Sequence, residues 1–253
     1  MRLVSWNLAG RLRRQPEQAA AVLAMAPDVV ALQEVTKNSL PLWREALAAA
    51  GLTHTVTPLD DGPPPRPRRL AVLTAARTPL ERLPLDGLPW PERAVSVAVD
   101  GIELLNVHSP IAPSPGLAKV LTHEALYAYA RERDRIVLAG DLNTPRRTHE
   151  DGTVLTFAHT SSGNLRPERG ERWAAAERAL VFTLREEHGW RDAFLDAPER
   201  TWTFKDDRGG WRLDHLLVKG VEVTARAYAH DWRRSGLSDH SAIVADVRPA
   251  GAP

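Results

Sequence analysis

Side chains that can bind a cation or move a proton stand at the ends of several apolar stretches of the sequence. They are carboxylates, amides and imidazoles in the fragments Trp6-Asn7, Gln33-Glu34, Asn106-Val107-His108, Gly140-Asp141-Leu142-Asn143, Asp214-His215 and Ser238-Asp239-His240. At the end of a buried strand such groups are costly unless they are paired or bind a cation. A ligand set rich in oxygen and free of thiolates favours a hard cation such as Mg²⁺ or Mn²⁺.

A hard cation held in this way would bridge to phosphate oxygens. The chemistry that fits is in-line attack of water on phosphorus, which needs a base, a metal clamp and a group that stabilises the developing charge. Each fragment alone has a plainer interpretation, since Glu34 or Asp141 could be a turn or cap residue and His108 a structural histidine. The order of the fragments and their place at strand ends carry the hypothesis.

The elements that must position these residues alternate between strands and helices. Apolar runs predict strands at residues 3–7, 28–35, 70–74, 94–99, 102–108, 135–140, 201–204, 211–218, 221–229 and 241–247. Helical spacing predicts helices at 16–25, 39–50, 116–131 and 173–187, the second capped by Ser39. Asp100-Gly101 is a hairpin signal, residues 63–69 a proline-rich loop and residues 146–172 a polar, irregular stretch.

Composition narrows the class of protein. The 253 residues are 43% hydrophobic and 26% charged, and we expect one domain over residues 1–253. The absence of cysteine excludes disulfides and thiol chemistry. No run approaches the length of a membrane span and the first residues lack the apolar core of a signal peptide, so we expect a cytoplasmic monomer that does not bind membranes.

The order of the motifs resembles the endonuclease/exonuclease/phosphatase superfamily, which has the DNase-I-like fold. The resemblance runs from Trp6-Asn7 through Leu32-Gln33-Glu34, Asn106-Val107-His108, Gly140-Asp141-Leu142-Asn143 and Arg212-Leu213-Asp214-His215 to Ser238-Asp239-His240. It implies an α/β class fold, a four-layered α/β sandwich in which two packed, mainly antiparallel β-sheets are flanked by helices.

The resemblance also implies a metal site for Mg²⁺ or Mn²⁺. Glu34 matches the main ligand of the family, with Asn7 beside it. Asp239 would assist in metal binding or orientation. Arg93, in Glu92-Arg93-Ala94-Val95-Ser96, is expected to touch phosphate, although an arginine at the start of a strand is often only solvated.

The remaining matches imply catalytic roles. Asp141 would accept the proton of the attacking water or position that water, and Asn143 would hold the same water or a phosphate oxygen. His240 would contact the scissile phosphate and transfer a proton, with Asp214 fixing its tautomer. His108 resembles the second histidine of the deoxyribonuclease and phosphatase branches.

The substrate is less clearly marked. Gly210-Trp211-Arg212-Leu213-Asp214 resembles abasic-site endonucleases, in which Trp211 and Leu213 would line a pocket for a baseless sugar, yet alternate strand positions facing one core would give the same pattern. Against that branch, Val107-His108-Ser109-Pro110 replaces its Tyr-x-Pro-Asn, and Ala9 stands where an acidic residue is often found.

Basic residues offer a second clue to the substrate. Net charge is only +1, but all except four of the 33 basic residues are arginine, which suits phosphate contacts; a GC-rich genome would explain the bias equally. Arginines cluster at 11–14, 66–69 and 146–147. We therefore expect a metal-dependent phosphodiesterase acting on DNA. The alternatives are a small-molecule or lipid phosphoesterase with the same metal site, and a catalytically inactive binding module.

Overall fold

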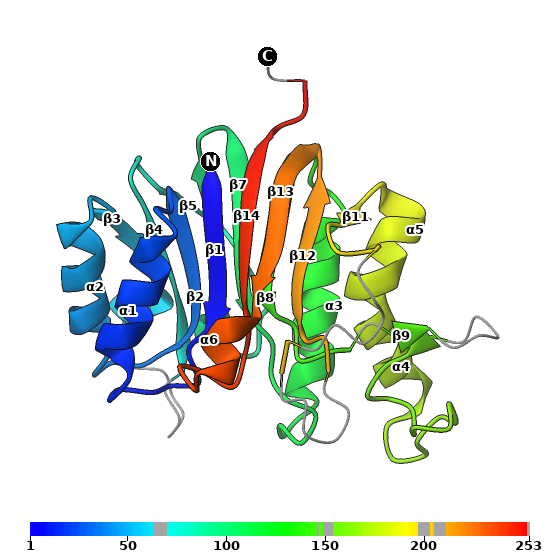
Figure 1. The fold of residues 1–253 in the computed structure, drawn as a ribbon. Coiled ribbons are helices and arrows are strands. Elements are labelled where there is room, and N and C mark those ends of the chain that lie inside the picture. Colours follow the sequence, from blue (N-terminus) through cyan, green and yellow to red (C-terminus); the bar gives the residue numbers. More distant parts are fainter. Residues whose placement is uncertain (63–69, 146, 149–153, 197–202, 205–210, 252–253) are drawn as a thin grey trace.

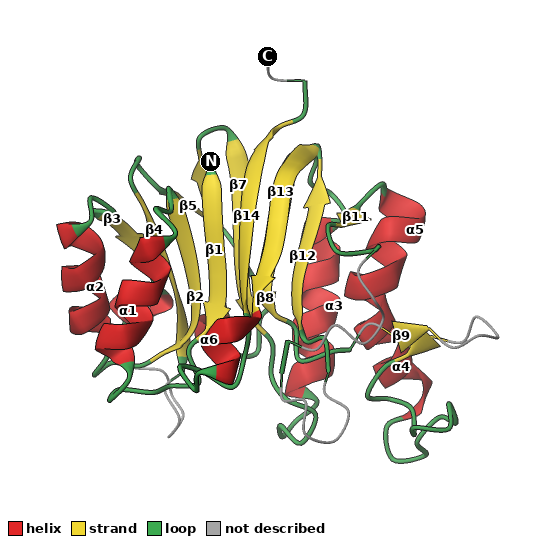
Figure 2. Cartoon of the chain, viewed as in Figure 1, coloured by secondary structure: helices red, strands yellow, loops and turns green. Residues whose placement is uncertain are grey.

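The chain forms two six-stranded sheets that pack face to face between layers of helices (Figures 1 and 2). The structure, a computed structural model, describes residues 1–253 except 63–69, 146, 149–153, 197–202, 205–210 and 252–253. This is the predicted four-layered α/β sandwich. Both sheets are mixed, because each contains one parallel pair of strands among antiparallel ones.

The first sheet is built from both halves of the sequence. Its order is β13 (Val221–Ala229), β14 (Ala242–Pro249), β1 (Arg2–Asn7), β2 (Val29–Val35), β4 (Ala71–Ala76) and β3 (His54–Val56). Strands β1 and β2 are parallel, joined through helix α1 (Gln15–Ala24). With α2 (Leu40–Ala49) and α6 (His230–Arg234), α1 covers the outer face of this sheet (Figure 1).

The second sheet has a related arrangement. Its order is β11 (Arg191–Asp192), β12 (Asp214–Lys219), β8 (Ile136–Asp141), β7 (Ile102–His108), β6 (Ala94–Val99) and β5 (Glu81–Leu83). Strands β7 and β8 are parallel and are joined through α3 (Ala118–Ala130). Helix α3, the π-helical turn Ala179–Thr183 and α5 (Leu184–His188) cover its outer face, and α4 (Gly170–Arg178) packs beside α3.

Central strands are buried on both faces, as their apolar runs predict. In β1, Leu3 packs in the core between the sheets, whereas Val4 and Trp6 pack against the helices. In β7, Leu104 faces the same central core and Leu105 faces α3. Alternation along each strand therefore fills three layers of side chains.

The turn at Asp100-Gly101 is the predicted hairpin between β6 and β7. Both residues have positive φ, 48° and 73°, as a two-residue hairpin of the mirror-image type requires.

Other predictions need correction. Ser39 does not cap α2 with its side chain, because its Oγ accepts a hydrogen bond from the Thr36 amide upstream of the helix. The helix predicted at 173–187 begins at Gly170 and is interrupted by the π-helical turn. The stretch 146–172 includes a short ribbon, β9 (Arg147–Thr148) with β10 (Val154–Leu155). Residues 63–69, and 201–202 of one predicted strand, lie outside the described residues.

The two parallel pairs determine where polar side chains gather. Because β1 and β2 end at the same edge of their sheet, and β7 and β8 at the same edge of theirs, Asn7, Glu34, His108 and Asp141 emerge together. None of the described helices is long and apolar enough to cross a membrane.

Candidate active site

A pocket of about 230 Å³ lies where the ends of these strands meet. It is lined by Ala9, Glu34, Ile111, Asp141, Asn143, Phe204, Asp239 and His240. Five of these are residues expected from the motifs, and they come from both sheets. The structure thus brings together side chains that are more than 200 positions apart in the sequence.

Asn7 joins the two sheets at the floor of the site. Its Nδ2 donates to Glu34 Oε1 at 3.3 Å and to Asp141 Oδ2 at 2.8 Å. Glu34 has a left-handed backbone, with φ of 61°, at the point where the pairing of β2 with β4 becomes irregular. That conformation is uncommon for a residue with a side chain and is typical of functional sites. Burial raises the pKa of the Glu34 carboxyl.

Asp141 is almost fully buried, with 1% of its surface exposed. Its Oδ1 accepts a hydrogen bond from the backbone N–H of Asn143 at 2.8 Å. Its Oδ2 also accepts a hydrogen bond from the side-chain Nδ2 of Asn143 at 3.2 Å. Burial raises the pKa of Asp141 to about 7, although the neighbouring charge of His240 lowers it. The carboxyl is therefore balanced between its two protonation states near neutral pH.

His240 and Asp214 form a buried hydrogen-bonded pair. Nδ1 of His240 lies 2.9 Å from Asp214 Oδ2, and its Nε2 lies 3.8 Å from Asp141 Oδ2. Burial opposes a charge on the imidazole, but Asp214 and then Asp141 outweigh it and raise the pKa of His240 to about 10. Asp214 thus directs the other ring nitrogen towards Asp141 and favours the imidazolium.

His108 and Arg93 complete the site from the second sheet. Arg93 Nη1 lies 2.5 Å from His108 Nδ1, and His108 Nε2 lies 3.5 Å from Glu34 Oε1. Burial, together with the charge of Arg93, lowers the pKa of His108 well below its usual value. Neutral His108 therefore leaves Arg93, which is 8% exposed, as a buried positive charge beside the carboxylates.

The donor set fits a divalent cation. Ligand atoms of Asp141, Asp214 and His240 lie within 4.8 Å of one another, but His240 and Asp214 already bond to each other. Glu34 and Asp239 face the pocket with oxygen donors. Because burial holds the pKa of Glu34 above its usual range, a cation here would offset the cost of its charge.

None of the three predicted substrate residues lines the pocket; Arg93 lies against His108 instead. Leu213 is 3% exposed, and the Trp211 ring contacts the Phe157 ring, with centroids 5.1 Å apart. Phe204 reaches the pocket instead, 4.8 Å from the His240 ring. It belongs to the Thr201-Trp202-Thr203-Phe204 fragment, whereas no signal in the sequence marks Ile111 as a lining residue.

The fold and the site define a class, the DNase-I-like α/β sandwiches with an acidic pocket at the ends of their sheets. Residues 4–240 match the profile of the endonuclease/exonuclease/phosphatase family. The chain belongs to this family, whose hydrolases act on phosphoester bonds.

Solved structures with the same fold share little sequence with this chain. An AP endonuclease from Archaeoglobus fulgidus is 19% identical, covering 97% of this chain and 98% of its own, with a TM-score of 0.67. A 3′-5′ exonuclease, NExo, from Neisseria meningitidis is 21% identical over 97% and 99%, with a TM-score of 0.68. A 3′ phosphatase NExo from Neisseria, bound to product DNA hairpin, is 21% identical over 98% and 99%, with a TM-score of 0.69. No curated protein matches the sequence.

Proposed function

We propose that the protein is a Mg²⁺- or Mn²⁺-dependent phosphodiesterase that hydrolyses P–O bonds of DNA. The observation that carries this proposal is the convergence of Glu34, Asp141, Asp239 and His240 on one pocket with buried Arg93 behind it. Bound at Glu34, Asn7 and Asp239, the cation would neutralise charge on a phosphate oxygen.

The residues of the chain supply the proton transfers. Asp141 accepts a proton from the attacking water, and a pKa of about 7 suits a base that works near neutral pH. Asn143, bonded to Asp141, orients the same water or a phosphate oxygen. His240, charged because its pKa is raised to about 10, donates a hydrogen bond to the scissile phosphate.

DNA is favoured by the loop that follows β1. Arg13 and Arg14 are exposed on it, while Arg11 Nη1 donates to the Gly236 carbonyl and ties the loop to the segment before Asp239. Arg14 pairs with Glu17 at 3.3 Å, and Ala9 of the same loop lines the pocket. Exposed arginines on such a loop can follow a phosphate backbone. The arginines at 66–69, and Arg146, lie outside the described residues.

Cleavage of labelled duplex DNA tests this function directly. One duplex carries a single abasic site and the other is intact, each with Mg²⁺ and with a chelator. We expect metal-dependent cutting that weakens steeply as salt rises. Cutting of the abasic duplex alone would indicate an abasic-site endonuclease, and cutting of both would indicate a general nuclease.

A small-molecule or lipid phosphoesterase is the second candidate. The pocket of about 230 Å³ is compact enough to fit a single phosphate and its sugar or alcohol. Failure of the folded, metal-supplied protein to cut either duplex, together with hydrolysis of a soluble phosphomonoester, would replace DNA with this class of substrate.

Removing the charge of Glu34 tests the metal site. We expect Glu34→Gln to raise the Mg²⁺ concentration for half-maximal activity by at least about tenfold, because a neutral amide binds a hard cation more weakly. The matched control is Glu222→Gln, since Glu222 pairs with Arg248 on an exposed strand. A metal titration that Glu34→Gln leaves unchanged would exclude Glu34 as a ligand.

A further inference from the structure

A buried ion pair lies behind the loop that carries Asp141 and Asn143. Lys119, on α3, is fully buried, and its Nζ donates to the carboxylate of Glu177 on α4 and, at 2.6 Å, to the backbone carbonyl of Asn143. Glu177 is 1% exposed. Neither residue lines the pocket, and the proposed chemistry uses neither of them.

The contact with Asn143 bears on an unusual backbone. Asn143 has φ of 48°, a left-handed conformation that directs its carbonyl away from the pocket towards Lys119. In the same conformation its side-chain Nδ2 donates to Asp141 Oδ2 and, at 2.8 Å, to the Ser109 carbonyl. The backbone carbonyl and the side-chain amide of Asn143 are thus held by different partners.

Glu177 connects the pair to the surrounding loops. Its Oε1 also accepts Thr144 Oγ1 at 3.3 Å, and its Oε2 accepts the Ala158 amide at 2.9 Å. Burial opposes a charge on Glu177, but the charge of Lys119 outweighs it and lowers the pKa of this carboxyl. The Phe157 ring lies 4.9 Å from Lys119 Nζ and covers the pair.

Stability alone is a weak reason for this arrangement. Replacing a buried ion pair with neutral side chains is often without cost, whereas removing one partner leaves an uncompensated charge and is strongly destabilising. The bond from Lys119 to the Asn143 carbonyl is the feature that a neutral pair would not reproduce.

We propose that Lys119, whose charge is balanced by Glu177, is a positioning residue. It fixes the left-handed backbone of Asn143 and so directs the side-chain amide of Asn143 at Asp141 and the reacting water. This inference rests on the role given to Asn143 in the proposed function. Loss of the bond would let the peptide between Asn143 and Thr144 rotate, and a displacement of about 1 Å in a catalytic group can cost on the order of a hundredfold in rate.

The test separates positioning from stability with a double variant. Lys119→Met alone is expected to lower both the unfolding midpoint and kcat, because it leaves the Glu177 charge unpaired. The double variant Lys119→Met/Glu177→Gln removes both charges of the ion pair. The glutamine side chain keeps an oxygen that can accept the hydrogen bond from the Ala158 backbone N–H. We expect the unfolding midpoint of the double variant to return towards that of the unaltered protein, while kcat for bis(p-nitrophenyl) phosphate stays at least about tenfold low and KM changes less than about threefold.

Two further variants make the outcome specific. Arg172→Gln breaks an exposed pair with Glu124 that joins the same two helices, and we expect no change in kcat. Adding the double variant to Asn143→Ala should cause no further loss, because Lys119 acts through Asn143.

The failures can be told apart. A stable double variant with unaltered kcat would overturn the positioning role and leave the proposed function intact. An unaltered kcat in Asn143→Ala alone would remove Asn143 from the chemistry, and with it this proposal. A further loss on adding the double variant to Asn143→Ala would show that Lys119 acts by another route and would also overturn the proposal.

Discussion

Asp141→Asn is expected to lower kcat at least about a hundredfold, because asparagine keeps the shape of Asp141 but cannot accept the proton of the attacking water. The same change should also flatten the fall of the thermal unfolding midpoint between about pH 5 and about pH 8, measured with a chelator. The comparison is made within each protein, because both oxygens of Asp141 accept N–H groups and the Nδ2 of asparagine cannot. Burial raises the pKa of Asp141 to about 7. The stability linked to its neutral form is therefore complete at low pH and is lost as pH rises through about 7, whereas asparagine stays neutral.

The matched control is Asp246→Asn, an identical change at an exposed carboxylate paired with Arg2 on the first sheet. It should leave kcat unchanged. Near-normal turnover by a folded Asp141→Asn protein would remove Asp141 from the mechanism. A fall of the midpoint with pH that is equally large in the variant would show that the pKa of Asp141 is not raised in the folded protein.

Gly140→Ala is expected to cost about 3 kcal/mol or more in the free energy of unfolding, measured by urea denaturation. Gly140 has φ of 137°, a region that residues with a side chain rarely adopt, and a Cβ there would lie 2.1 Å from the Val107 carbonyl oxygen. Strain and overpacking each cost about 1–3 kcal/mol. Neither can relax easily, because β7 and β8 are paired at this position.

Gly189→Ala separates the two effects. Gly189 also has positive φ, 71°, at the end of α5, but a Cβ there would meet nothing within 4 Å. Its cost should stay near about 1 kcal/mol. Equal losses for the two alanine variants would mean that the close approach of Val107 adds nothing.

The sequence predicts the centre of the fold better than its edges. Central strands such as β2 and β8 are long apolar runs, so consecutive apolar residues in the sequence predict that these strands are buried. The edge strands β3 and β5 have three residues each and too few positions for a periodic signal. Their pairing is decided by the neighbouring strand, which no local pattern reports.

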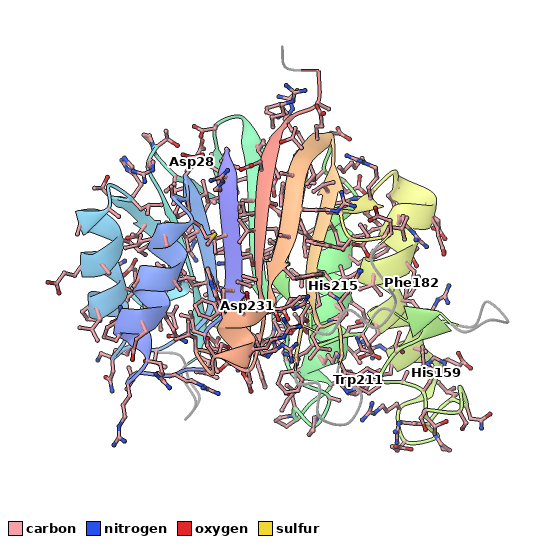
Figure 3. The ribbon with its side chains drawn as sticks, viewed as in Figure 1. Asp28, His159, Phe182, Trp211, His215 and Asp231 are labelled. Atoms are coloured by element: carbon pink, nitrogen blue, oxygen red, sulfur yellow. The ribbon has the colours of Figure 1, made fainter. Side chains whose placement is uncertain are left out.

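The candidate site divides in the same way. Motif order indicates Glu34, Asp141 and His240, because Glu34 and Asp141 stand at the ends of apolar runs and His240 stands directly before one. No pattern in the sequence indicates the pair of Lys119 and Glu177. The two residues lie in different helices, 58 positions apart, and each has the residue type expected of an exposed helical position. Trp211 and Phe204 face different surroundings although both belong to aromatic fragments. The Trp211 ring packs against Phe157, and in the view of Figure 3 Trp211 lies below His215.

The pairing of β1 with β14 has a consequence for the time at which activity arises. Trp6 Nε1 donates to the His240 carbonyl, and Ser238 Oγ donates to the Asn7 carbonyl, so the first strand meets its partners some 230 positions later. At ribosomal speeds, about 10 to 50 s pass between the synthesis of these two segments. Contacts of such long range also form slowly. Until His240 has been synthesised, the nascent chain therefore lacks the imidazole of the candidate site, so the activity that we propose cannot begin during most of translation.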